Sequence, residues 1–291
     1  MVGYYPQSVF EALSKMKENK PMVIVSGGTD IMVCGKKAEH MIFLNQISEL
    51  KEISQDNGVL SIGAECTYAE ILNEKKVPEI LKKAIRQIAS PAVRNSGTLS
   101  GNICNASPAG DSLPVLYALS AVVISKYLND NGEIITEKTP IEEFILGIRK
   151  IALKEEAIVT SIEIPSENYS NISKMYYEKV GSRKSEAISK LSFIGILKVE
   201  DEKIVDARIA FGSVSIKTVR RHEIENKMIG LTLKEINNKK EEFIDEYSQF
   251  ITPIDDQRST AAYRKKACLN LLREFLSENG ETLWFWLEME N

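Results

Sequence analysis

Two glycine-bearing segments constrain this chain more than any other feature of its sequence. The first follows a short apolar run directly, where Ile24-Val25 leads into Ser26-Gly27-Gly28-Thr29-Asp30. The second, Gly97-Thr98-Leu99-Ser100-Gly101-Asn102, lies far downstream. Glycines let backbone N–H groups approach an anion without an obstructing Cβ, and hydroxyl and amide side chains add donors. Two such segments in one chain suit a ligand that is bridged by a diphosphate.

The common nucleotide-binding fingerprints are absent from the sequence. Neither G-x-G-x-x-G nor G-x-x-x-x-G-K-[ST] occurs. Those motifs place phosphates at the start of a helix in Rossmann and P-loop proteins. Their absence disfavours a nucleotide site of the Rossmann or P-loop type.

Composition excludes several further classes of protein. The chain has 291 residues, of which 43% are hydrophobic and 27% charged, and at about 150 residues per domain this predicts roughly two folded domains. The net charge of −4 provides no general attraction to nucleic acid or to anionic lipid. No apolar run approaches the ~18 residues of a membrane helix, and the first residues do not resemble a signal peptide. We therefore expect a cytoplasmic protein that binds neither nucleic acid nor membrane.

Cysteine and histidine are too few and too scattered for a metal centre. The chain has four cysteines without a C-x-x-C pair and two histidines, His40 and His222. A disulfide framework, an all-cysteine cluster and a histidine-rich metal site are all disfavoured. We expect half-buried thiols, a solvated His222, and a function that depends on a bound cofactor.

The first part of the chain is expected to alternate helices and strands. Strands are predicted at 22–25, 41–44, 59–64, 121–127 and 158–164, with a hairpin turn at 129–132. Helices are predicted to begin at Ser8, Thr67 and Pro78, two of them with capping-box spacing. Residues 90–114 show no clear periodicity, which predicts a long functional loop.

The pattern changes after a polar segment at 166–173. Three strands are predicted next, at 173–180, 191–199 and 204–211. Helices are predicted after them, at 216–229, 232–250 and 258–277. Strands followed by helices indicate a separate α+β module, with the boundary in the polar segment.

Several segments together resemble one family. The run IASPAVRNSGTLSGNICNASPAGD, from Ile88 to Asp111, closely resembles the signature of the FAD-binding medium subunits of molybdenum hydroxylases, the family of xanthine, carbon monoxide and nicotinate dehydrogenases. Residues 26–30 resemble the other flavin loop of that family, and 158–165 the strand that closes its flavin domain. Residues 260–264 resemble the last helix of its C-terminal domain. The resemblance extends, in order, over nearly the whole chain.

The resemblance implies a mixed α/β and α+β fold with two domains. Residues 1–170 would form an FAD-binding domain of the vanillyl-alcohol-oxidase-like (PCMH) type, with subdomains at about 1–55 and 56–170. Residues 171–291 would form an α+β C-terminal domain of the carbon monoxide dehydrogenase flavoprotein type.

The resemblance also implies which residues hold FAD. The segment from Ile24 to Ile31 would wrap the pyrophosphate, and Thr98 to Asn102 would hold it from the other side. Asp111 matches a contact to the nucleotide portion, and Lys179 matches a lysine that reaches the flavin and would stabilise its reduced, anionic form. The expected cofactor residues are Ile24, Val25, Ser26, Gly27, Gly28, Thr29, Asp30, Ile31, Ala89, Thr98, Leu99, Ser100, Gly101, Asn102, Asp111, Arg149, Ile158, Val159 and Lys179. No separate catalytic residue and no metal ligand is implied.

The sequence departs from the family pattern at two positions of the flavin loops. Ser100 stands where the family usually has the first of two glycines, so its backbone must avoid positive φ. Ser26 replaces a common alanine. The cysteine-rich insert that carries an iron–sulfur cluster in some relatives is absent, so no cluster is expected in this chain.

The implied function is that of an electron-transfer subunit in a multi-subunit oxidoreductase. Its partners would be a molybdopterin-containing large subunit and a 2Fe-2S small subunit, and electrons would pass from the iron–sulfur centres through FAD to NAD(P)⁺ or another acceptor. One alternative is a self-contained FAD-dependent oxidase, although neither histidine lies in a flavin loop where it could link the cofactor covalently. Another is a non-enzymatic nucleotide-binding module, which would leave Lys179 without a task.

Overall fold

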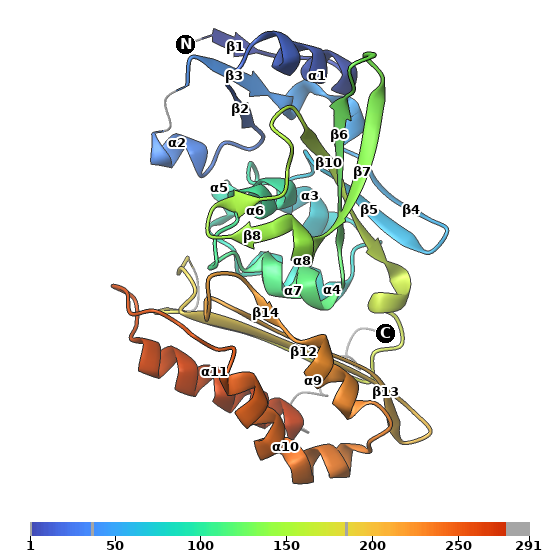
Figure 1. The fold of residues 1–291 in the computed structure, drawn as a ribbon, viewed down its shortest axis with the longest axis vertical. Coiled ribbons are helices and arrows are strands. Elements are labelled where there is room, and N and C mark those ends of the chain that lie inside the picture. Colours follow the sequence, from blue (N-terminus) through green and yellow to red (C-terminus); the bar gives the residue numbers. More distant parts are fainter. Residues whose placement is uncertain (1, 36–37, 184–185, 278–291) are drawn as a thin grey trace. The chain divides into compact units, whose positions relative to one another are not determined.

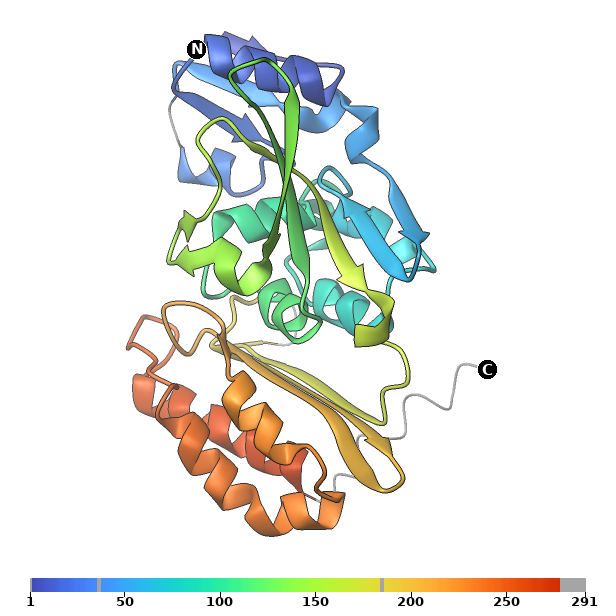
Figure 2. The same cartoon turned by 45° about the vertical axis from the view of Figure 1, so that its right-hand side comes forward.

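The structure is a computed structural model that describes residues 2–35, 38–183 and 186–277. The chain forms two compact units, coloured along the sequence in Figure 1 and turned in Figure 2. Unit 1 comprises Met1–Ser107 and Leu119–Asn168, and unit 2 comprises Pro108–Ala118 and Tyr169–Asn291. The segment Pro108–Ala118 thus belongs to the same unit as the C-terminal part of the chain.

The first layer of unit 1 is a small parallel sheet. Its strands are β1 (Val2–Tyr4), β3 (His40–Phe43) and β2 (Met22–Val25), in that spatial order. Helix α1 (Val9–Glu18) begins after Ser8, whose hydroxyl accepts the N–H of Glu11. The buried face of α1 packs in one apolar cluster with β3 and the 3₁₀ turns η1 (Leu44–Gln46) and η2 (Ser48–Leu50). Strand β2 leads into the short helix α2 (Ile31–Cys34).

The second layer of unit 1 is an antiparallel sheet of five strands. Their spatial order is β4 (Ile53–Asp56), β5 (Val59–Gly63), β10 (Ile158–Pro165), β6 (Val122–Leu128) and β7 (Ile134–Pro140). Helices α3 (Tyr68–Asn73), α4 (Glu79–Arg86), α5 (Pro91–Arg94) and α6 (Leu99–Asn105) complete this part of the unit (Figure 1). A separate two-stranded hairpin, β8 (Ile145–Gly147) with β9 (Lys150–Ile151), follows helix α8 (Ile141–Phe144).

The prediction of a long loop at 90–114 is wrong. This stretch contains α5, α6 and the start of α7 (Ser112–Ala118). The first two helices, of 4 and 7 residues, begin at side-chain caps on Ser90 and Thr98. Helices this short contain too few turns to produce a periodic apolar pattern, so their caps are the signal that identifies them.

Unit 2 is built on an antiparallel sheet of four strands. Their order is β11 (Lys174–Val180), β12 (Leu191–Glu200), β13 (Lys203–Gly212) and β14 (Val219–Arg220). Helices α10 (Leu233–Ser248) and α11 (Ala261–Leu276) cover one face of this sheet (Figures 1 and 2). Phe193, Phe211 and Phe275 lie in the core on that face. The predicted helix at 216–229 is confirmed only in its second half, as helix α9 (His222–Glu225) and the 3₁₀ turn η4 (Asn226–Met228), whereas β14 occupies its first half. Pairing of Val219 with Phe211 outweighs the local helical pattern.

Helix α7 covers the other face of the unit 2 sheet. Side chains alternate between the two faces of a strand, so Ser192 and its cross-strand partner Gly212 face away from the core that contains Phe193. A Cβ on Gly212 would come within 2.7 Å of the Pro114 side chain in α7. The sheet is therefore enclosed between α7 on one side and α10 with α11 on the other.

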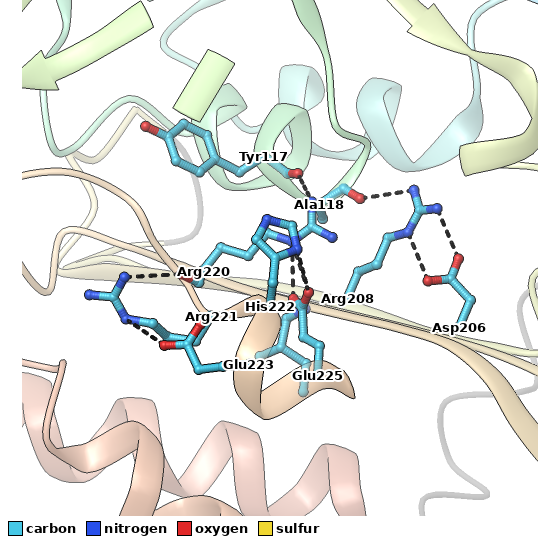
Figure 3. A network of polar contacts seen from close by, with 10 residues as sticks. Tyr117, Ala118, Asp206, Arg208, Arg220, Arg221, His222, Glu223 and Glu225 are labelled. Carbon is cyan, nitrogen blue, oxygen red and sulfur yellow. Dashed lines mark hydrogen bonds and ion pairs between the residues drawn. The ribbon is translucent and has the colours of Figure 1, made fainter. Parts of the chain in front are cut away.

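Two arginines of this sheet hold the C-terminal end of α7 (Figure 3). Arg220 donates to the carbonyl oxygen of Tyr117 at 2.5 Å, and Arg208 donates to that of Ala118 at 3.3 Å. Both carbonyls lie in the last turn of the helix, where no N–H of the helix itself is available to them. The Arg220 side chain is 5% exposed and pairs with Glu225 at 3.0 Å, and that carboxylate also accepts the N–H of Ile209. Burial raises the pKa of Glu225, and the guanidinium of Arg220 opposes this shift.

Every helix within the described ranges is too short or too polar to traverse a lipid bilayer.

Candidate functional site

The two glycine-bearing segments meet within unit 1. The Oγ of Ser26 and the Oγ1 of Thr98 lie 2.8 Å apart. An ideal Cβ built on Gly27 would lie 1.8 Å from the carbonyl oxygen of Ser96. The backbone of the first loop therefore lies directly against the backbone of the second, and residue 27 must be glycine for this approach.

The first loop presents backbone donors that the protein leaves unused. In the part of the chain that the structure describes, no acceptor is hydrogen-bonded to the N–H groups of Gly27, Gly28 or Thr29. Gly28 adopts φ of +71°, in the left-handed region that glycine enters without strain. Consecutive N–H groups in such a turn form a concave site for an anion. A diphosphate, with several acceptor oxygens, fits this donor set.

The second loop is a capped helix start. The hydroxyl of Thr98 accepts the N–H of Gly101 at 3.1 Å and thereby begins α6. Ser100 is buried in the first turn of this helix, and its hydroxyl donates to the carbonyl oxygen of Ala64. Its φ is negative, as the sequence requires of a serine at this glycine position.

Arg149 joins the first loop from the turn between β8 and β9. Its guanidinium pairs with the carboxylate of Asp30 at 3.0 Å, and both side chains are about half exposed. The backbone of Arg149 has φ of +55°, and its N–H donates to the carbonyl oxygen of Ala106. The turn thus carries the guanidinium to the end of the loop that contains Gly28.

The remaining expected residues of unit 1 lie at different places. The carbonyl oxygen of Ala89 accepts a hydrogen bond from Arg94 at 2.9 Å, and Ala89 has φ of +45°. Ile158 and Val159 are buried in β10, where they pair with β6.

Asp111 and Lys179 contact each other in unit 2. The ammonium of Lys179 lies 2.7 Å from Oδ2 of Asp111, and the two side chains are 6% and 9% exposed. The hydroxyl of Ser189 donates to Oδ1, and that of Tyr177 donates to the Asp111 carbonyl oxygen. Burial raises the pKa of Asp111, while Lys179 and Ser189 oppose the rise. Sequence reasoning assigned these two residues separate roles and did not anticipate their ion pair.

Glu65 is a residue of the site region that sequence reasoning missed. It follows β5, is 5% exposed, and its carboxyl interacts with the hydroxyl of Ser26 in the first loop. Burial raises the pKa of its carboxyl to about 7, with Ser26 and Lys51 opposing the rise. The sequence signal was a single acidic residue in the otherwise small and apolar segment at 62–66. Burying an ionised carboxylate in such a segment costs free energy unless the carboxylate has an ionic or hydrogen-bonding partner or takes up a proton.

The cysteines and histidines of the described residues do not form a metal-binding cluster. In the described residues, no group of three or more histidine, cysteine, aspartate or glutamate side chains could hold a metal ion. Burial raises the pKa of the Cys66 and Cys104 thiols to about 12, which keeps them protonated and unreactive. His222, expected to be solvated, is 55% exposed in its side chain and lies 3.4 Å from Glu225.

Two family matches together account for most of the chain. Residues 2–167 match the family described as the FAD binding domain in molybdopterin dehydrogenase. Residues 176–279 match the family described as the CO dehydrogenase flavoprotein C-terminal domain.

Individual proteins match over nearly the same length. The chain is 28% identical over 269 residues to the glyceraldehyde dehydrogenase medium chain of Sulfolobus acidocaldarius, covering 89% of this chain and 91% of the relative. It is 27% identical to the nicotinate dehydrogenase FAD-subunit of Eubacterium barkeri, covering 79% and 80%. A chain of the carbon monoxide dehydrogenase structure from Hydrogenophaga pseudoflava superimposes with a TM-score of 0.83 at 22% identity, covering 94% and 95%. This structural match confirms the expected fold.

Proposed function

Because this chain belongs to the FAD-binding medium subunits of the molybdenum hydroxylase family, we propose that it transfers electrons between an iron–sulfur subunit and NAD(P)⁺ or another acceptor. The partners in this proposal are a 2Fe-2S small subunit and a molybdopterin-containing large subunit. The names of relatives such as the nicotinate dehydrogenase FAD-subunit support an assembly of this kind. Bound FAD would supply the ability to exchange electrons in pairs or singly, and backbone and side-chain groups of this chain would bind and orient it.

The observation that carries the proposal is the contact between the two loops of unit 1. The backbone at Gly27 touches that at Ser96, and the N–H groups of Gly27, Gly28 and Thr29 are left without a protein acceptor in the described residues. We propose that these donors, with the hydroxyl of Thr98 that Ser26 contacts, hold the FAD diphosphate. The donor set is neutral and rich in N–H and O–H groups, which suits a phosphate anion.

The other expected cofactor residues remain part of this proposal, as does the division into an FAD-binding domain at 1–170 and a C-terminal domain at 171–291. Arg149 extends the donor set, since its guanidinium is held beside the first loop by Asp30. Lys179 is assigned to the flavin by the family resemblance alone, and its ion pair with Asp111 fixes its side chain within unit 2.

The full chain is expected to bind FAD noncovalently and to prefer it to FMN. FMN lacks the diphosphate and the nucleotide portion, so we expect at least about tenfold weaker binding, equivalent to about 1.4 kcal/mol. Acid precipitation of the purified protein should release FAD into the supernatant, where its chromatographic retention identifies it. Flavin retained in the pellet, or equal affinity for FMN, would contradict the proposal.

The same purified protein can be used to distinguish the function of an electron-transfer subunit from that of a complete oxidase. Alone, the chain should catalyse at most electron transfer from NAD(P)H to an artificial acceptor, without hydroxylating a substrate. Co-purification from its native source should recover the molybdenum and iron–sulfur subunits, identified by mass. Substrate hydroxylation by the isolated chain would favour the oxidase instead.

A further inference from the structure

Glu65 lies at the base of the two loops and is connected to both. Its backbone N–H donates to the carbonyl oxygen of Leu50, which fixes the residue at the end of β5. Its carboxyl interacts with the hydroxyl of Ser26, immediately before Gly27, which favours the ionised form. Among the described residues, its Oε1 is buried and has no hydrogen-bond partner. A buried polar atom without a partner is unusual in a folded protein and calls for an explanation.

A chain of hydroxyl groups extends from this carboxyl across the site. Ser26 Oγ lies 2.8 Å from Thr98 Oγ1, which lies 3.4 Å from Ser100 Oγ. The Ser100 hydroxyl donates to the carbonyl oxygen of Ala64, the neighbour of Glu65 in the chain. The network therefore begins at Glu65 and ends at its neighbour Ala64, and both residues directly follow β5. Ser26 and Ser100, the two departures from the family pattern in these loops, are both members of it.

The protonation state of Glu65 decides the direction of these hydrogen bonds. An ionised carboxylate can only accept, so it takes the hydrogen of Ser26, and the Ser26 oxygen then accepts from Thr98. A protonated carboxyl can instead donate to Ser26, which then donates to Thr98. In that arrangement the hydrogen of the Thr98 hydroxyl is released from Ser26 and is available to an anion.

The groups around Glu65 give little compensation for a negative charge. Lys51, after η2, and Ser26 both favour the ionised form, but burial outweighs them. The adjacent Cys66 thiol stays protonated, and Glu70 on α3 is a further negative group beside that thiol. The elements β10 and α6 contribute neutral groups, the Thr160 carbonyl that accepts the N–H of Ala64 and the Thr98 and Ser100 hydroxyls.

We propose that Glu65 is a positioning residue of the FAD site, which must carry a proton for the two loops to hold the diphosphate, so that FAD binding takes up one proton. This inference rests on the proposed function, because it requires the diphosphate to lie at these loops. The proton comes from solvent and remains on the carboxyl while FAD is bound. A bound diphosphate then disfavours ionisation of Glu65 further, because like charges repel each other in a site of low dielectric constant.

The proposal predicts a pH dependence of FAD affinity with a definite sign. The carboxyl titrates near 7 in the free protein, so below that pH it is already protonated and affinity is constant. Above that pH, binding must add a proton, and affinity falls by about tenfold per pH unit. Glutamine mimics the protonated carboxyl in shape and in its ability to donate. Glu65→Gln should therefore keep the low-pH affinity of the wild type across the whole range.

The experiment is a titration of the full, flavin-free chain with FAD between about pH 6 and pH 9, followed by flavin fluorescence. Glu52→Gln is the matched control, since Glu52 is an exposed carboxylate near the same strand end, and it should reproduce the wild-type profile. Calorimetry at about pH 8 in two buffers of different ionisation enthalpy should record uptake of about one proton by the wild type and about none by Glu65→Gln.

The possible results separate this inference from the proposed function. Binding of FAD by the wild type with pH-independent affinity, or without proton uptake, would overturn the role of Glu65 alone. Equal pH profiles in wild type and Glu65→Gln would do so as well. Failure of the wild type to bind FAD at any pH would overturn both. If circular dichroism shows that Glu65→Gln is unfolded, proton uptake by the wild type still decides the question.

Discussion

Gly27→Ala is expected to lose FAD almost completely. The added Cβ would lie 1.8 Å from the carbonyl oxygen of Ser96, far inside van der Waals contact, and neither partner is a flexible side-chain end. The two loops must therefore separate, which displaces the donors at Gly27 and Gly28 from the hydroxyl of Thr98. We expect FAD affinity to fall by at least about 100-fold, equivalent to about 2.7 kcal/mol. Equilibrium dialysis against FAD measures this loss.

A matched alanine substitution distinguishes loop separation from a general loss of stability. Among the residues that the structure describes, none places an atom within 4 Å of an ideal Cβ on Gly147, and Gly147 does not have positive φ. Gly147→Ala should therefore retain wild-type affinity. Circular dichroism should show that Gly27→Ala keeps its secondary structure. A Gly27→Ala protein that binds FAD like the wild type would contradict the assignment of these loops to the diphosphate.

Sequence alone does not show which glycine of the site is least able to accept a side chain. Gly27 and Gly101 both lie in the segments that the sequence singled out, but the nearest atom to a Cβ on Gly101 is the Thr98 hydroxyl oxygen at 2.9 Å. That contact lies within one helical turn. The contact of Gly27 with Ser96 joins segments far apart in the sequence, and it becomes visible only when both loops have been placed in space.

The elements that the sequence predicted well are those specified by local chemistry. Strand β2 has the predicted bounds at 22–25, and α3 begins at the predicted capping box on Thr67. Helix α7 and strand β14 were missed, because long-range contacts define both. Arg220 joins them through the Tyr117 carbonyl group, across more than a third of the chain. The local spacing of apolar residues gives no information about a hydrogen bond between residues so far apart in the sequence.

The same reasoning explains why the assignment of Asp111 and Lys179 was incomplete. Each residue was identified within its own motif, one after the glycine-rich run and the other in a predicted strand. Lys179 is opposite Ser192 on the face of the sheet that α7 covers, and Asp111 immediately precedes α7. The ion pair therefore follows from the packing of α7 on the sheet, which neither motif encodes by itself.

Lys179→Met is expected to destabilise unit 2 strongly, whatever its effect on electron transfer. The substitution leaves the buried carboxylate of Asp111 without its cation, and breaking a buried pair in this way costs about 3–5 kcal/mol. The midpoint of chemical unfolding, followed by circular dichroism, should fall accordingly. Lys203→Met is the control, because Lys203 is an exposed lysine of the same sheet, and its effect should stay within about 0.5 kcal/mol.

The double variant Asp111→Leu/Lys179→Met separates the structural role of the pair from a role toward the flavin. Removing both charges together should recover most of the lost stability, since apolar replacements of a buried pair are often neutral. If Lys179 also stabilises a reduced, anionic flavin, as we propose, the double variant will remain slow in electron transfer and will have a lowered flavin reduction potential. Recovery of stability, rate and potential together would show that Lys179 serves the packing of α7 alone. A Lys179→Met protein as stable as the wild type would contradict the buried pair itself.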